Sequence, residues 1–287
     1  IPVSFDTVYG VSWSPDGSKI ACGCADNTLR AFSAKDGKQL VFQGAHSDWV
    51  LGTSFSQDGQ HLVSVSRDRS VKLTEVETNR FIDNVTSITP GALKGGLLAV
   101  EVRPVKDPRP EQIARVIAAF GSMPLKGNPA TLLLATSIPP KRMAVIPKDA
   151  VGVTQKVYDE LLVAGSDGIP RLYKMHRETK RVIGDDANKV REYEKMPGRI
   201  YAVGFNKKGT MFLAGSSLDG VGEARVYETD TAKRLSLLEN VKSPVYAVAF
   251  RPNGTLVATG GFDGKVRLSD PNTGGLLKEF VPVPLKK

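Results

Sequence analysis

The chain has 287 residues, of which 41% are hydrophobic and 24% are charged, so wholesale disorder is excluded. Its 39 Lys and Arg residues outnumber the 30 Asp and Glu residues, and the formal net charge of +9 permits contact with anionic partners. No run approaches 18 consecutive apolar residues, so the sequence predicts no membrane-spanning helix. No signal-peptide pattern is recognisable at the start of the given sequence.

One pattern recurs along the chain and predicts a repeat architecture. A strand of alternating apolar residues that ends in a glycine-containing turn occupies residues 8–17, 49–59, 200–209 and 245–254. Glycine suits these turns because it adopts positive φ without steric cost. A second strand, a tight turn that contains an aspartate, and a third strand are expected to follow each of them.

The turn aspartates define the length of the repeat. They are Asp26, Asp68, Asp167, Asp219 and Asp263, with spacings of 42, 99, 52 and 44 residues. Each is followed by a basic residue on the third strand, expected either to pair with neighbouring carboxylates or carbonyls or to form a phosphate-binding ring: Arg30, Lys72, Arg171, Arg225 and Arg267. Residues 220–222 lengthen the fourth turn. A period in the low forties predicts four-stranded propeller blades.

The pattern resembles the WD40 repeat, which ends its third strand with Trp-Asp. The terminal tryptophan is replaced in all five units, by Phe32, Thr74, Tyr173, Tyr227 and Ser269. Only Gly44-Ala-His46 matches the family's Gly-His element. The resemblance implies a hydrogen-bonded chain in the second unit through His46, Ser64 or Ser66, and Asp68, with Thr74 in place of the tryptophan.

Residues 47–51, 81–95, 181–188 and 260–267 are similar to a narrower family. These are multidomain bacterial proteins of planctomycete type, in which WD40 blades are joined to a c-type cytochrome domain. The resemblance implies a periplasmic or envelope location, with the cytoplasm as the alternative, and a haem domain or subunit in the same complex. This chain contains no Cys-x-x-Cys-His motif, so any haem would lie outside it.

The long spacing between Asp68 and Asp167 predicts an insertion at about 105–158, between the first strand (92–103) and the second strand (160–165) of the third blade. It is expected to hold a short helix at 110–120 and strands at 131–135 and 143–146. Its net charge is +5, and its candidate contact residues are Arg109, Arg115, Lys141 and Arg142. A solvated loop, an acidic protein surface and a lipid headgroup layer stay open, whereas nucleic acid is disfavoured because aromatic residues do not alternate with the basic ones.

The predicted fold is an all-β, WD40-like propeller with about five four-stranded blades, forming one domain over 1–287. Five blades are few for a ring. More blades could precede Ile1, the insertion could fill the gap, or another chain could complete the circle; the abrupt start before a strand favours the first. The prolines at 282 and 284 suggest an exit linker, since they stop strand pairing.

No catalytic, metal or cofactor motif is present among the three histidines, the two cysteines and the Asp185-Asp186 pair, which is interpreted as a turn rather than a calcium site. The sequence therefore predicts a non-enzymatic scaffold for protein partners. Four aromatic residues occupy corresponding places at the starts of first strands, where they either form a contact surface or pack between blades: Tyr9, Trp49, Tyr201 and Tyr246. The alternatives are an accessory domain of a c-type cytochrome complex and, less favoured, an enzyme at the channel mouth.

Overall fold

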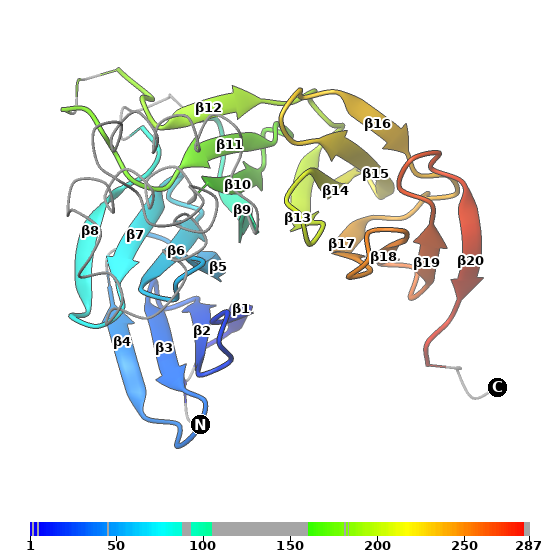
Figure 1. The fold of residues 1–287 in the computed structure, drawn as a ribbon. Coiled ribbons are helices and arrows are strands. Elements are labelled where there is room, and N and C mark those ends of the chain that lie inside the picture. The colour runs from blue at the N-terminus through cyan, green and yellow to red at the C-terminus, as the bar shows by residue number, and fades with distance from the viewer. Residues whose placement is uncertain are drawn as a thin grey trace, which may run out of the picture.

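The computed structural model describes residues 1–104 and 160–283, apart from residues 2, 5, 45, 88–92, 181 and 183. This part of the chain contains no helix; its strands form five four-stranded antiparallel sheets, so the predicted all-β fold with about five four-stranded blades is confirmed. The sheets follow one another along an open arc (Figure 1), and the first strand of each lies nearest the centre. The predicted insertion at 105–158, with its helix and strands, lies outside the described residues.

Each sheet is a meander in which strands consecutive in the sequence pair with one another. The first sheet comprises β1 (Val8–Trp13), β2 (Lys19–Cys24), β3 (Leu29–Ser33) and β4 (Gln39–Gln43), and the second β5 (Val50–Phe55), β6 (His61–Ser66), β7 (Val71–Glu75) and β8 (Arg80–Asn84). The third comprises β9 (Leu97–Val102), β10 (Glu160–Gly165), β11 (Arg171–Lys174) and β12 (Lys189–Glu192). The fourth comprises β13 (Arg199–Phe205), β14 (Met211–Leu218), β15 (Val221–Glu228) and β16 (Arg234–Leu237), and the fifth β17 (Val245–Phe250), β18 (Val257–Gly261), β19 (Val266–Ser269) and β20 (Leu276–Phe280).

The inner strands approach one another so closely that some positions admit only glycine. A Cβ atom on Gly10 would lie 2.8 Å from the carbonyl oxygen of Leu51 in the next sheet, and one on Gly23 would lie 2.5 Å from that of Val50. Real side chains do not tolerate such contacts with backbone atoms. Glycine at these positions therefore lets β1 and β2 pack directly against β5.

The core lies between neighbouring sheets. We call the sheet face that packs on the following sheet the trailing face, and the face that packs on the preceding sheet the leading face. In the first interface, Ala21 and Ala31 on the trailing face pack with Phe55 and Leu62 on the leading face of the second sheet, and all four are buried. The other three interfaces have the same character and are formed by the following clusters: Val63 and Leu73 with Val102 and Leu161, Leu162 and Leu172 with Phe205 and Phe212, and Leu213 and Val226 with Val245 and Val257.

Arg103 follows β9 and is a buried cation between the third and fourth sheets. Its guanidinium lies 2.7 Å from the Glu160 carboxylate in its own sheet and 2.8 Å from the Asp230 carboxylate in the next, and its Nε donates to the carbonyl of Gly209. Breaking a buried ion pair by removing one partner is strongly destabilising. The network therefore couples the two sheets.

We predict that Arg103→Met lowers the free energy of unfolding by about 3–5 kcal/mol, because two carboxylates lose their buried partner. Chemical denaturation followed by circular dichroism measures the effect. The control is Arg80→Met, which removes an exposed pair with Glu75 and should cost less than about 1 kcal/mol. Equal losses in the two variants would contradict the role assigned to Arg103.

Polar side chains of the inner strands also connect neighbouring sheets. Ser54 Oγ accepts a hydrogen bond from the backbone N–H of Val102 at 3.0 Å, and the next residue in this series, Glu101, accepts one from Phe205 N–H at 2.6 Å. Burial raises the pKa of Glu101 to about 7, although the Phe205 N–H acts in the opposite direction. The folded chain therefore holds a proton on Glu101 that the unfolded chain releases near pH 4.5.

Because the pKa of Glu101 is raised on folding, the folded state binds more protons than the unfolded state between about pH 4.5 and 7, and stability falls as the pH rises through this window. The contribution can reach about 1.4 kcal/mol per pH unit. We predict that Glu101→Gln, which keeps the acceptor oxygen, gains stability relative to the natural chain as the pH is raised from 5 to 7. Urea denaturation at several pH values tests this, and a constant difference between the two proteins would contradict it.

Candidate functional site

The starts of the inner strands and the turns between second and third strands lie on one rim of the arc, as the antiparallel pairing of Val8 with Cys24 and of Val245 with Gly261 requires. Large apolar side chains on this rim are partly or largely exposed. We call the following set the strand-start rim: Tyr9, Trp49, Tyr201, Leu218, Val221, Tyr246 and Phe262. Such a concentration of apolar side chains on one rim is a candidate contact surface.

A bulge directs three of these aromatic side chains. The pairing of the first two strands skips one residue at Tyr9, at Tyr201 and at Tyr246. An extra residue in one strand re-aims its side chain, which explains how residues on inner strands reach the rim. The same bulge in the second and third sheets carries Leu51 and Leu98.

Trp49 does not occupy the position that corresponds to the three tyrosines, contrary to the expected alignment. It precedes β5 by one residue, and Leu51 stands at the bulge instead. The guanidinium of Arg67 lies 4.2 Å from the centre of the Trp49 ring, a cation–π contact that fixes the indole at the rim. Trp49 therefore lies on the strand-start rim because it precedes the strand and contacts Arg67, and not because of a bulge.

The four aromatic residues form two pairs, each of which spans two neighbouring sheets. Tyr9 and Trp49 stack with ring centres 5.5 Å apart, and Tyr201 and Tyr246 meet edge to face at 5.1 Å. These residues thus pack between blades and are also accessible to solvent. Packing between blades and exposure on a contact surface, the two alternatives left open by the sequence, are therefore compatible at these positions. Aromatic pairs fixed in this way lose little conformational freedom when a partner binds.

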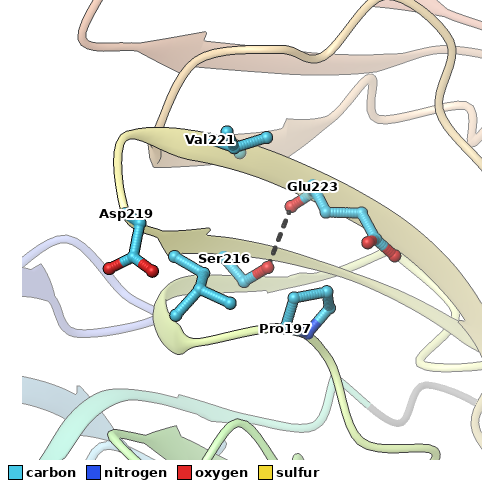
Figure 2. Close-up of a pocket in the computed structure, with 7 residues that line it drawn as sticks. Pro197, Ser216, Asp219, Val221 and Glu223 are labelled. Atoms are coloured by element: carbon cyan, nitrogen blue, oxygen red, sulfur yellow. Dashed lines mark hydrogen bonds between the residues drawn. The ribbon is translucent and has the colours of Figure 1, made fainter.

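A pocket of about 300 Å³ lies on the same rim, where the two-residue turn Asp219-Gly220 joins β14 to β15. The predicted lengthening of this turn by residues 220–222 is wrong, because residues 221 and 222 pair with β14 and so lengthen the strands instead. Figure 2 shows Asp219 at the corner of this hairpin and Glu223 on the other side of the pocket, with Ser216 between them. The exposed side chains of Leu218 and Val221 contribute its apolar part. The pocket therefore combines an apolar wall with a carboxylate at its edge.

The turn aspartates lie on this rim, and three of them pair with the basic residue four positions later. The distances are 2.6 Å for Asp26–Arg30, 2.7 Å for Asp167–Arg171 and 2.5 Å for Asp263–Arg267. In the fourth sheet, Arg225 instead contacts Glu223 and Glu194, and Asp219 stays at the hairpin corner. The carboxylate-pairing interpretation thus accounts for these arginines without a phosphate ligand.

His46 and Asp68 belong to a buried network in the second sheet. His46 Nδ1 lies 2.9 Å from Asp68 Oδ2, and His46 Nε2 lies 2.8 Å from Ser64 Oγ. Ser66 instead donates to the carbonyl of Asp48. Burial alone would raise the pKa of Asp68, but hydrogen bonds from His46 and Ser70 outweigh it and hold the pKa well below its usual range.

The two cysteines are free and buried in the first sheet. Burial raises the pKa of Cys22 to about 12 and also raises that of Cys24, so both stay protonated at neutral pH. Asp185 pairs with Arg177 at 2.7 Å, and Asp186 accepts a hydrogen bond from Tyr173. Over residues 1–104 and 160–283, with the gaps given above, His, Cys, Asp and Glu side chains do not gather in threes as a metal site would need.

Three segments match the family "WD domain, G-beta repeat", at residues 4–33, 37–74 and 233–270. This chain contains WD40 repeats. Two of the matched segments begin just before a fourth strand and one begins just before a first strand. Each ends on a third strand or one residue after it, so the unit of sequence repetition is offset from the sheet. The described part of the WD40 chain has no helix long and apolar enough to cross a membrane.

Several eukaryotic WD-repeat proteins are similar to parts of this WD40 chain. One component of chromatin assembly factor 1 from Gallus gallus is 28% identical over 83 residues, which is 29% of this chain and 15% of that protein. WD repeat-containing protein 1 of Bos taurus is 32% identical over 79 residues, or 26% and 13%. WD repeat-containing protein 91 homolog of Dictyostelium discoideum is 33% identical over 61 residues, or 21% and 8%.

The matched part of the chain therefore spans less than a sixth of each of these relatives. The matches give no support to the expected bacterial cytochrome-linked family or to a periplasmic location, which stay predictions. Arg109, Arg115, Lys141 and Arg142, the candidate contact residues of the insertion, lie outside the described residues.

We predict that His46→Ala lowers the free energy of unfolding by about 1–3 kcal/mol, because the buried Ser64 hydroxyl and the Asp68 carboxylate each lose a partner. Thermal and chemical denaturation measure the loss. The control is Thr255→Ala in the exposed turn between β17 and β18, where little change is expected. If His46→Ala were as stable as this control, the network would have no structural role.

Proposed function

We propose that this WD40 chain is a non-enzymatic scaffold that binds a protein partner through the strand-start rim. The observation that carries the proposal is the pairing of partly exposed aromatic side chains across neighbouring sheets, Tyr9 with Trp49 and Tyr201 with Tyr246. Tyrosine and tryptophan dominate the energetic centres of protein interfaces. WD40 repeat proteins are generally scaffolds of this kind, which agrees with the proposal.

The pocket includes Ser216, which pairs with Ile200 next to the bulged Tyr201, and its lining suggests which partner side chain it would receive. Leu218 and Val221 offer apolar contact, and the Asp219 carboxylate stands at the corner of the hairpin. Lys and Arg side chains combine an aliphatic stem with a cationic end, so either of them suits this combination. The proposed partner segment therefore carries a basic residue next to one that packs on Tyr201 and Tyr246.

A photo-crosslinking amino acid placed at Tyr246 tests the proposal in the native host. We expect a specific adduct with a protein partner, and the same probe at Thr255, an exposed residue on the opposite rim of the same sheet, should give none. With the partner identified, Tyr246→Ala should weaken binding by at least about tenfold, as loss of an interface anchor does. Equal adducts at both positions, or none at Tyr246, would contradict the assignment of this rim.

As a second candidate function, we propose an accessory role in an envelope complex with a c-type cytochrome. This proposal rests on the sequence resemblance described above. It would place the haem in another domain or subunit. Purification of the complex from its native host, followed by visible spectroscopy, tests it: haem absorption that co-elutes with this chain supports the role, and a complex without haem removes it.

A further inference from the structure

Asp219 is the turn aspartate that the fold leaves without a partner. In the first, third and fifth sheets this aspartate pairs with the arginine four positions later, and in the second sheet Asp68 pairs with His46. The Asp219 carboxylate forms no hydrogen bond or ion pair with any residue that the structure describes. The fourth sheet therefore leaves open a carboxylate that the other sheets satisfy internally.

The register of the β14–β15 hairpin explains this difference. In the first sheet the pairing of the second and third strands ends one residue pair beyond Arg30. In the fourth sheet it continues for four pairs beyond Arg225, to Leu218 and Val221. Each residue of a strand adds about 3.3 Å, so Arg225 lies about 13 Å from the tip of the hairpin. Arg225 is therefore too far from Asp219 to pair with it, and it contacts two glutamates instead.

The turn holds the Asp219 carboxylate at the tip of this hairpin. The φ angles are 50° at Asp219 and 83° at Gly220. Two consecutive residues with positive φ make the tight two-residue turn that matches the twist of paired strands. On one side of the hairpin, Gly222 lies against the carbonyl oxygen of Ser243, with no room for a Cβ atom between them. The connection to the fifth sheet therefore supports the hairpin, and a partner that binds its tip orders little additional backbone.

The two faces of the hairpin separate the pocket from a nearby cation. Side chains alternate between the two faces of a strand, so Leu218, Val221 and Glu223 share the face that lines the pocket. Asp219 and Glu223 stand at the two ends of the pocket (Figure 2). Arg199 pairs with the residue of β14 that precedes Leu218, so its side chain belongs to the opposite face. The pocket therefore joins an apolar wall to carboxylates at both ends.

We infer that this pocket receives an arginine side chain of the protein partner, which pairs with the Asp219 carboxylate. The inference rests on the proposed function and narrows the basic residue of the partner to arginine. A guanidinium has five N–H donors in one plane, so it can bind a carboxylate through two parallel hydrogen bonds while its aliphatic stem packs on Leu218 and Val221. A compact ammonium offers a point charge instead. The chain itself uses arginine in each of the three pairs between a turn aspartate and the residue four positions later: Arg30, Arg171 and Arg267.

The partner segment that crosslinks to the probe at Tyr246 supplies the ligand for the test. Fluorescence anisotropy measures a synthetic peptide of that segment, and the same peptide with its arginine replaced by lysine, against the natural chain and Asp219→Asn. Asparagine before glycine keeps the tight turn, so the variant retains the hairpin. We expect Asp219→Asn to weaken binding of the arginine peptide at least about tenfold, and of the lysine peptide less than about threefold. The control Asp6→Asn removes an exposed carboxylate before β1 and should change neither affinity.

Three results would overturn the inference while the proposed function stands. One is a crosslinked partner segment that contains no arginine. Another is a peptide whose binding depends on Tyr246 but is unchanged by Asp219→Asn. The third is equal weakening of the arginine and lysine peptides, since Asp219 would then act as a general negative charge. Binding that depends on neither Asp219 nor Tyr246 would overturn the proposed function as well.

Discussion

The structure depends on one constraint: each four-stranded sheet is apolar on both faces, so it needs a neighbouring sheet on each side. Within the arc, small and medium aliphatic side chains of one trailing face pack with bulkier side chains of the next leading face, as Ala21 and Ala31 do with Phe55 and Leu62. A single repeat unit of about forty residues buries too small a share of its surface to be stable alone. Stability is therefore shared between neighbours, as in other repeat proteins.

Polar contacts between neighbouring sheets fix their relative position, which apolar packing alone does not determine. Arg103 joins the carboxylates of Glu160 and Asp230, and the hydroxyl of Tyr193 donates to the carbonyl of Thr229 in the next sheet at 2.7 Å. Such contacts are satisfied in one relative position of two sheets, so they fix how each sheet is placed on its neighbour. That fixed placement holds the bulged tyrosines of adjacent sheets within contact distance at the strand-start rim.

Much of the fold could be predicted from the sequence because the pattern is local. Alternation of apolar residues, the glycine turn and the turn aspartate recur within each unit, and they place all five sheets, including the third, whose β9 and β10 are far apart in the sequence. The replacement of every terminal tryptophan did not obscure this. Tyr173 and Tyr227 at that position are fully buried and hydrogen-bonded through their hydroxyl groups.

The site was less predictable because it depends on contacts between units. A bulge shifts the register by one residue, so the sequence aligns Trp49 with Tyr9, whereas Leu51 occupies that position in the structure. Nothing in the sequence around Glu101 or Arg103 indicates that the next sheet buries them. The extra residues at 220–222 are visible in the sequence, but they lengthen β14 and β15 rather than the turn, and the pocket also needs Pro197 from the preceding connection.

Native-state hydrogen exchange tests the central claim most directly, because it measures the opening free energy of each strand separately. If each sheet is stabilised by neighbours on both faces, amides of β6, β10 and β14 should be protected more strongly than those of β2 and β18 at the two ends of the arc. Equal protection of all five sheets, or stronger protection at the ends, would contradict the account.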